Sequence, residues 1–167
     1  MPDKARLTLL LPAEADTDRL GRALAGLLGP GDAVLLHGPV GAGKTHLARA
    51  LIRARLGDAR AEVPSPTFTL VQVYDTPGAE VWHADLYRLA HPDEVTELGL
   101  EAAFAGAVTL VEWPDRLGAA RPPEALELHL APAGGGRRAT LEGGRRHHGL
   151  IGRLAAWMAR AGRDGAA

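Results

Sequence analysis

The residues best suited to chemistry in this sequence form one glycine-rich stretch, residues 38–45. It reads Gly-Pro-Val-Gly-Ala-Gly-Lys-Thr and matches the pattern G-x-x-x-x-G-K-[ST] of a phosphate-binding loop, or P-loop. In such a loop backbone N–H groups surround the anion, the lysine reaches the β- and γ-phosphates, and the hydroxyl binds Mg²⁺. The stretch therefore predicts nucleotide binding by Gly38, Val40, Gly41, Ala42, Gly43, Lys44 and Thr45.

The segments on either side support this interpretation. Residues 33–37 form a short apolar run that is typical of a buried strand, and residues 46–53 have the composition of a helix. A strand followed by a loop and a helix directs the helix N-terminus toward a single anion. The alternative, a glycine-rich turn with a chance lysine, does not require these flanks.

Two carboxylates follow apolar runs in the way that active-site acids follow strands. Glu112 ends the run 107–111, and Asp85 ends the run 81–84. In α/β sheets, ligands bind beyond the carboxyl ends of the strands. Either residue could hold Mg²⁺ while the other orients an attacking water, although a solvated carboxylate at a strand end is the simpler alternative.

Weaker candidates lie between these motifs. Thr67 lies in a proline-flanked loop, residues 65–67, which resembles a switch segment that senses the γ-phosphate, or is simply a rigid connection. His83 could act as an acid or a base, but a lone histidine in a strand is more often a hydrogen-bonded core residue. Residues 137–163 carry seven arginines against a single glutamate. That excess forms either a solvated basic face or a surface for an acidic protein or tRNA.

Composition restricts the remaining possibilities. The chain has 167 residues, a net charge of −1 and no cysteine. We therefore expect one domain over residues 1–167, with no disulfides and no thiolate metal site. No apolar run approaches membrane-spanning length, so we predict no membrane association and a cytoplasmic location. Residues 162–167 are predicted to be a disordered tail.

The order of the predicted elements indicates an α/β fold. A helix capped by Asp16 or Thr17 precedes the P-loop unit, and another begins near Leu150. Strands and helices that alternate along the chain, together with one hairpin, predict a three-layer P-loop NTPase fold with a mixed, mostly parallel central sheet and an antiparallel hairpin. Besides 33–37 and 107–111, the predicted strands are 6–11, 68–74, 80–86, 125–130 and 138–142, of which 68–74 and 80–86 form the hairpin.

With these motifs in place, the chain resembles the bacterial TsaE (YjeE) family of small P-loop ATPases. Beyond the P-loop, the resemblance rests on S-P-T-F-T-L-V at 65–71, H-A-D-L-Y-R-L at 83–89, E-L-G-L at 97–100 and V-E-W-P at 111–114. Their order and spacing match over roughly residues 7–142. The second of these motifs departs slightly from the family pattern, because Ala84 replaces a residue that is often bulkier.

The resemblance implies a specific function in tRNA modification. The family assists the synthesis of threonylcarbamoyladenosine in tRNA, at the adenosine after the anticodon. Its members dock on the TsaB–TsaD heterodimer and hydrolyse ATP with Mg²⁺ to reset that complex, so contact with tRNA would be indirect. The expected protein is therefore an ATPase that is slow alone and activated by its partners.

The resemblance also implies a role for each matching residue. Lys44 would bind phosphate, Thr45 and Glu112 would be Mg²⁺ ligands, and Asp85 would lie near the metal. Thr67 belongs to the switch-like loop, and Trp113 stands beside the nucleotide. Three further positions fall where the family contacts nucleotide, namely Glu14, Thr17 and Arg137.

Two other functions stay open at this point. A small-molecule kinase would need arginines that clamp phosphate, for which Arg145 and Arg146 are available, but no acceptor-binding motif is evident. A nucleotide-sensing binding module would need no hydrolysis at all. The guanine-reading motif N-K-x-D does not occur in the chain, which favours adenine.

Overall fold

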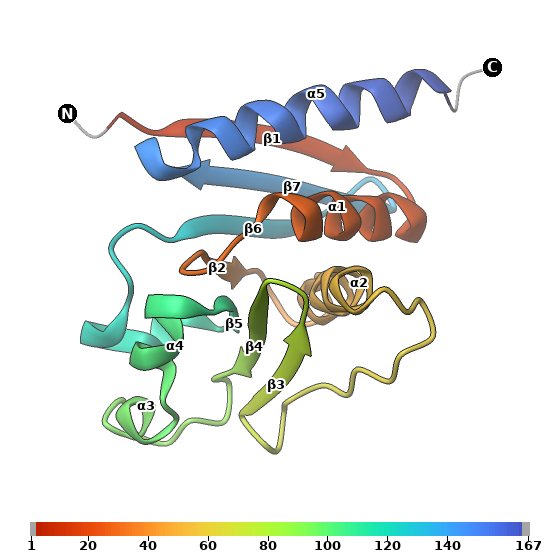
Figure 1. Cartoon of the computed structure of the whole chain (residues 1–167). Coiled ribbons are helices and arrows are strands. Elements are labelled where there is room, and N and C mark those ends of the chain that lie inside the picture. Colours follow the sequence, from red (N-terminus) through yellow and green to blue (C-terminus); the bar gives the residue numbers. More distant parts are fainter. Residues whose placement is uncertain (1–2, 165–167) are drawn as a thin grey trace.

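A seven-stranded sheet runs through the centre of the computed structural model, which describes residues 3–164 (Figure 1). The order of the strands across the sheet is β1-β7-β6-β2-β5-β4-β3. Their bounds are β1 Ala5–Leu11, β2 Ala33–His37, β3 Val71–Thr76, β4 Ala79–Asp85, β5 Val108–Glu112, β6 Leu126–Ala133 and β7 Gly136–Gly143.

Strand directions confirm a mixed sheet with a parallel centre. β6, β2, β5 and β4 are parallel neighbours, whereas β7 and β3 run antiparallel to the strands beside them. Within the described part of the chain, five strands therefore point one way and two the other. β3 and β4 form the predicted hairpin, joined by Pro77 and Gly78. Because β2, β5 and β4 are parallel, their carboxyl ends reach one edge of the sheet together.

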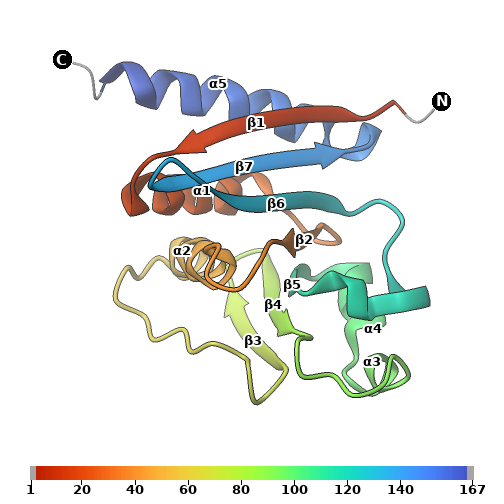
Figure 2. The ribbon, with the colours of Figure 1, turned by 180° about the vertical axis from the view of Figure 1, so that it is seen from behind.

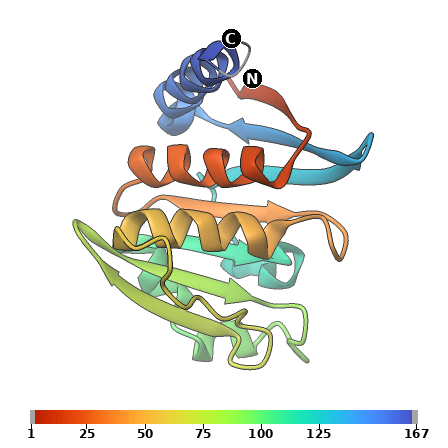
Figure 3. The same ribbon diagram turned by 90° about the vertical axis from the view of Figure 1, so that its right-hand side faces the viewer.

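Helices on both faces make the three layers. Val34 and Leu36 of β2 face one side and pack in a core with α1, α2 and α5, while Leu35 between them faces the other side and packs with α3 and α4. Figure 3 shows α1 and α2 side by side over the first face. The helix bounds are α1 Glu14–Leu27, α2 Lys44–Leu56, α3 Glu94–Glu97, α4 Leu100–Gly106 and α5 His148–Asp164, with short 3₁₀ segments at Pro114–Ala120 and Arg145–His147.

One part of the sheet has helices on a single face only. Along β1, exposed and partly buried residues alternate, so that Arg6, Thr8 and Leu10 face outward. β6 shows the same alternation, with His129 exposed between buried leucines. Seen from behind, β1, β7 and β6 lie in front of α1 and α5 (Figure 2). The outer face of these strands is consequently open to solvent.

The predicted strand 68–74 is wrong at its first residues. β3 begins only at Val71, and residues 66–69 form a turn in which the Leu70 N–H donates to the Pro66 carbonyl at 2.8 Å. Leu70 has a φ of 67°, a left-handed conformation that a strand cannot contain. Phe68, which favours a strand by propensity, is 81% exposed. The turn overrides that propensity.

The predicted cap of the first helix is also wrong. α1 begins at Glu14 with Ala13 as its N-cap, one turn earlier than Asp16 or Thr17 would place it. Asp16 still serves the helix end, because its carboxylate accepts a hydrogen bond from the Ala13 N–H at 2.9 Å. A side chain in the first turn thus satisfies a backbone donor that the helix leaves free.

At the C-terminus, α5 continues to Asp164, so residues 162–164 are helical where the sequence predicted disorder. Residues 165–167 of that predicted tail lie outside the described residues. Within residues 3–164, no helix is both long enough and apolar enough to cross a membrane. The division of the chain into a single domain stays a prediction.

Candidate functional site

The P-loop connects the end of β2 to the start of α2, as the sequence predicted. Its glycines are required by their surroundings as well as by their backbone angles. Gly38 has a φ of 150°, and a Cβ there would lie 2.5 Å from the Leu130 carbonyl oxygen. Gly43 has a φ of 103°, and a Cβ there would meet the guanidinium of Arg137 at 2.6 Å. Larger residues cannot take this path, which brings backbone N–H groups to the N-terminus of α2.

Lys44 is held in place although its side chain carries a charge. It is only 5% exposed, and its Nζ donates to the Gly38 carbonyl at 2.6 Å. The same ammonium lies 3.4 Å from the ring centroid of Trp113, a cation–π contact. Burial lowers the pKa of Lys44, and the charges of Glu112 and Asp85 oppose that shift. The lysine is therefore held beside two carboxylates by contacts on its own side of the pocket.

Glu112 joins two elements through its two carboxylate oxygens. Oε1 accepts a hydrogen bond from the Thr45 hydroxyl at 2.7 Å, and Oε2 lies 2.7 Å from His83 Nε2. Glu112 and His83 are both buried. A buried carboxylate needs such partners. The arrangement places a hydroxyl and a carboxylate together at the start of α2.

Asp85 stands beside Glu112, because the two residues are register partners at the ends of β4 and β5. Its Oδ1 accepts a hydrogen bond from the Tyr87 N–H at 3.0 Å. Burial raises the pKa of Asp85, and the neighbouring charge of Glu112 adds to this, while the bond from Tyr87 opposes it. Two carboxylates in one cleft with Lys44 form the kind of charge cluster found at functional sites.

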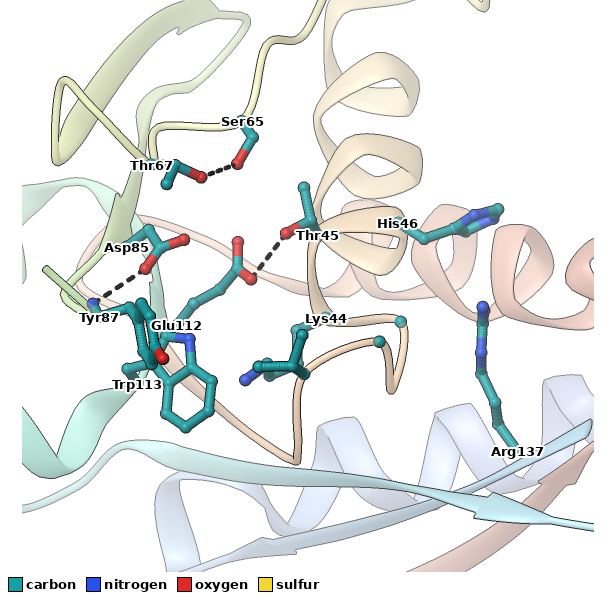
Figure 4. Close-up of a pocket in the computed structure, with 13 residues that line it drawn as sticks. Lys44, Thr45, His46, Ser65, Thr67, Asp85, Tyr87, Glu112, Trp113 and Arg137 are labelled. Atoms are coloured by element: carbon teal, nitrogen blue, oxygen red, sulfur yellow. Dashed lines mark hydrogen bonds between the residues drawn. The ribbon is translucent and has the colours of Figure 1, made fainter.

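These groups line one pocket with residues of the 65–67 loop (Figure 4). Ser65 and Thr67 share a hydrogen bond of 2.7 Å between their hydroxyls. The Leu70 carbonyl accepts the Asp85 N–H at 2.9 Å, which ties the end of this loop to β4. The lining consists of Val40, Gly41, Gly43, Lys44, Thr45, His46, Ser65, Thr67, Asp85, Tyr87, Glu112, Trp113 and Arg137.

Among residues 3–164, two residues other than glycine have a left-handed backbone, and each is part of this pocket or of a segment that contributes to it. Trp113 has a φ of 57° and lines it directly, and Leu70 ends the loop that carries Thr67. Such conformations persist only where the surrounding structure holds them, and they gather at functional sites. The polar ends of parallel strands, the P-loop and these strained positions converge on one pocket.

A family model for the TsaE family, described as threonylcarbamoyl adenosine biosynthesis protein TsaE, matches residues 11–140 of this chain. The chain belongs to the TsaE family. The TsaE protein of Rickettsia bellii is 40% identical over 121 residues, which cover 72% of this chain and 83% of the relative. The TsaE protein of Bacillus subtilis is 36% identical over 124 residues, covering 74% of this chain and 76% of that protein.

A solved structure has the same fold. The crystal structure of YdiB from Bacillus subtilis superimposes with a TM-score of 0.69 at 24% identity, over 96% of this chain and 97% of that one. This chain and YdiB therefore share an α/β fold, which in this chain has a seven-stranded mixed sheet.

Three peripheral residues predicted for nucleotide contact are placed differently from one another. Arg137 lines the pocket of this TsaE-family chain, and its Nη1 donates to the Thr17 hydroxyl at 3.1 Å. Thr17 is fully buried and does not itself line the pocket. Glu14 is exposed in the first turn of α1 and does not line the described pocket. Nucleotide contact by Glu14 stays a prediction.

Sequence reasoning missed the lining residue His46 and the buried partner of His83. His46 follows the lysine and threonine of the P-loop, lines the pocket and bonds to Asp18 of α1 at 2.7 Å. Its position in the first turn of α2 was the available signal. His83 is a hydrogen-bonded core histidine, as expected for a strand, but its partner is Glu112. No pattern along the chain reveals that pairing.

Proposed function

We propose that this TsaE-family chain is an Mg²⁺-dependent ATPase that works in threonylcarbamoyladenosine modification of tRNA, hydrolysing ATP when docked on the TsaB–TsaD heterodimer in the cytoplasm. The observation that carries the proposal is the convergence of Lys44, Thr45, Glu112 and Asp85 on one pocket at the P-loop. The names of the relatives supply the pathway.

The donor set fits Mg²⁺ and a polyphosphate. Mg²⁺ prefers hard oxygen ligands, usually one or two carboxylates together with phosphate oxygens. Thr45 and Glu112 offer a hydroxyl and a carboxylate 2.7 Å apart, and Asp85 offers a second carboxylate beside them. When bound, the ion would neutralise charge that develops on the phosphates during transfer.

Each residue then has a defined task. Lys44, already held beside the pocket by Trp113, would bind the phosphates. Glu112 would hold the ion with Thr45, and His83 would fix the orientation of the Glu112 carboxylate through the bond at 2.7 Å. Asp85 would either complete the ligand set or orient the attacking water. Thr67, across the pocket on the switch-like loop, would respond to the γ-phosphate.

Exposed apolar side chains at the rim of the pocket support a docked partner. Val40 and Tyr87 line the pocket and are 79% and 51% exposed, and Phe68 on the neighbouring turn is 81% exposed. Large apolar side chains that remain together in water commonly mark a protein interface. A partner that covers this rim would also exclude water from the phosphates.

The arginines that a kinase would need to clamp phosphate lie away from the P-loop. The Arg146 guanidinium donates to Asp32, next to the start of β2, at 2.9 Å, whereas the P-loop lies at the other end of that strand. Neither Arg145 nor Arg146 lines the P-loop pocket in the described residues. No other observation favours a kinase.

The deciding experiment measures ATP turnover with and without the TsaB–TsaD pair. We expect slow turnover by the chain alone, strong activation by the pair, and loss of both in Lys44→Ala. Absence of turnover with the pair present, together with normal tRNA modification by Lys44→Ala, would overturn the proposal. A Glu112→Ala variant that still docks with ATP and supports full function in cells would instead favour the nucleotide-sensing module.

A further inference from the structure

On the open face of the sheet, two histidines and one glutamate form a cluster that the proposed ATPase does not use. His37 ends β2, and Glu127 and His129 lie on the neighbouring strand β6. Their nitrogen and oxygen ligand atoms all lie within 4.8 Å of one another. None of the three lines the P-loop pocket.

The strands fix this proximity. His37 and His129 are register partners in the parallel pair β2–β6, and Glu127 is two residues before His129, so all three side chains are on one face. The His37 and His129 rings stack with centroids 4.3 Å apart, and His37 Nε2 lies 2.5 Å from Glu127 Oε2. Ligands carried by strands are held more precisely than ligands carried by loops.

We infer that His37, Glu127 and His129 form a binding site for a transition-metal dication, with Zn²⁺ as the best match. Two imidazoles and one carboxylate are a ligand set that Zn²⁺ takes in proteins, with water in the fourth position. Imidazole suits Zn²⁺, Cu²⁺ and Ni²⁺, whereas Mg²⁺ prefers oxygen. The site therefore differs in chemistry from the hydroxyl and carboxylate set at Thr45 and Glu112.

Arg121 supplies the outer contact that such sites commonly have. Its Nη2 donates to Glu127 Oε1, the carboxylate oxygen that His37 does not approach. A carboxylate held from one side presents its other oxygen in a fixed direction, as outer-shell partners of metal ligands do. The ion would replace the direct contact between Glu127 Oε2 and His37 Nε2, and these two atoms must move apart to admit it, because both would bind the ion at about 2 Å in a tetrahedral arrangement.

The stacked rings require a further movement. Parallel imidazole rings do not aim their lone pairs at a common point, so one ring must turn out of the stack. His129 is the exposed ring of the pair and has no hydrogen-bond partner among the described residues, whereas His37 is anchored to Glu127. Without a metal, His37, Glu127 and Arg121 would form a hydrogen-bonded network that needs no further partner. His129 takes no part in that network, but the metal site needs it as a ligand.

The test is a Zn²⁺ titration of the full-length protein by calorimetry, after removal of metals and with excess Mg²⁺ present to compete at the P-loop. We expect one ion per chain and an affinity that falls at least about 100-fold in His129→Ala, at or beyond the upper range for disturbing a metal's outer contacts. His91→Ala is the matched control, because His91 is also exposed and lies in a loop elsewhere; its affinity should equal that of the wild type.

Two further readouts make the outcome decisive. Glu127→Gln should weaken Zn²⁺ binding in the same way, and ATP binding should be unchanged in His129→Ala, because His129 is exposed and does not line the P-loop pocket. Zn²⁺ affinity that survives both substitutions, or that falls in Glu112→Gln instead, would overturn the assignment. Equal losses in His91→Ala and His129→Ala would also overturn it, since they would indicate unspecific binding to surface histidines.

Discussion

Two histidine–glutamate pairs in this fold are built alike and differ in their surroundings. His83 of β4 reaches Glu112 of β5, and His37 of β2 reaches Glu127 of β6, with Nε2 to carboxylate distances of 2.7 and 2.5 Å. Each pair bridges two parallel neighbouring strands, and each glutamate is two residues away from the register partner of its histidine. The local geometry does not distinguish them.

Burial and the second carboxylate oxygen do distinguish them. The side chains of His83 and Glu112 are 0% and 3% exposed, against 15% and 22% for His37 and Glu127. Glu112 turns its other oxygen to the hydroxyl of Thr45, whereas Glu127 turns its other oxygen to Arg121. In low dielectric a carboxylate interacts more strongly with its neighbours. The same histidine–glutamate pairing between parallel strands therefore has two outcomes. Where it is buried beside the P-loop, the glutamate is a charged group of the candidate site, and where it is partly exposed, the glutamate belongs to a surface cluster.

The largest contrast should come from the two glutamates. Glu112→Gln should lower ATP turnover in the TsaB–TsaD complex by roughly 100- to 1,000-fold, the range for losing one preorganised electrostatic group in an active site. Glu127→Gln, the matched substitution in the exposed pair, should leave turnover within about twofold, since neither Glu127 nor its partners His37 and Arg121 line the pocket. Steady-state kinetics at saturating Mg²⁺ check both. Equal losses of turnover in the two variants would contradict the assignment of Glu112, and not Glu127, to the candidate site.

A smaller contrast should come from the third partner of each pair. Thr45→Val removes the hydroxyl that donates to Glu112 and that would bind the ion, so we expect turnover to fall about 10- to 100-fold, recovering in part at high Mg²⁺. Arg121→Ala should leave turnover unchanged. The measurement is the dependence of turnover on Mg²⁺ concentration in both variants. A Thr45→Val enzyme with the Mg²⁺ dependence of the wild type would contradict the role given to this hydroxyl.

Much of the candidate site at the P-loop could be predicted because its parts are local. The P-loop pattern specifies backbone geometry within eight residues, and Glu112 and Asp85 each follow an apolar run that reads as a strand. Parallel strands then bring their carboxyl ends together, as the register of Asp85 with Glu112 shows. The same reasoning placed the hairpin and the central strand β5.

The remainder depends on contacts between distant segments. The sequence near Phe68 does not indicate that Leu70 takes a left-handed conformation. That turn is held by hydrogen bonds from the Leu70 N–H to the Pro66 carbonyl and from the Asp85 N–H of another strand to the Leu70 carbonyl. Strand propensity alone therefore extended β3 too far. The partners of His83 and His37 are 29 and 90 residues away in the chain, so neither pair has a sequence signature. The cap of α1 was misplaced for a related reason, since the start of this helix is set by the bond from the Ala13 N–H to Asp16, which only the folded first turn makes.

The smallest contrast concerns stability and should come from the two histidines. His83→Leu keeps the volume but leaves the buried carboxylate of Glu112 without one partner, which should lower the free energy of unfolding by about 1–3 kcal/mol. His37→Leu loses a pair that water partly screens, so we expect less than about 1 kcal/mol. Urea denaturation without nucleotide measures both changes, and His91→Leu is the exposed control. An unchanged dependence of the unfolding free energy on urea concentration would indicate that the substitution altered only the stability. If His37→Leu destabilises the protein as much as His83→Leu, burial is not what separates the pairs, and the second contact of each glutamate must carry the difference alone.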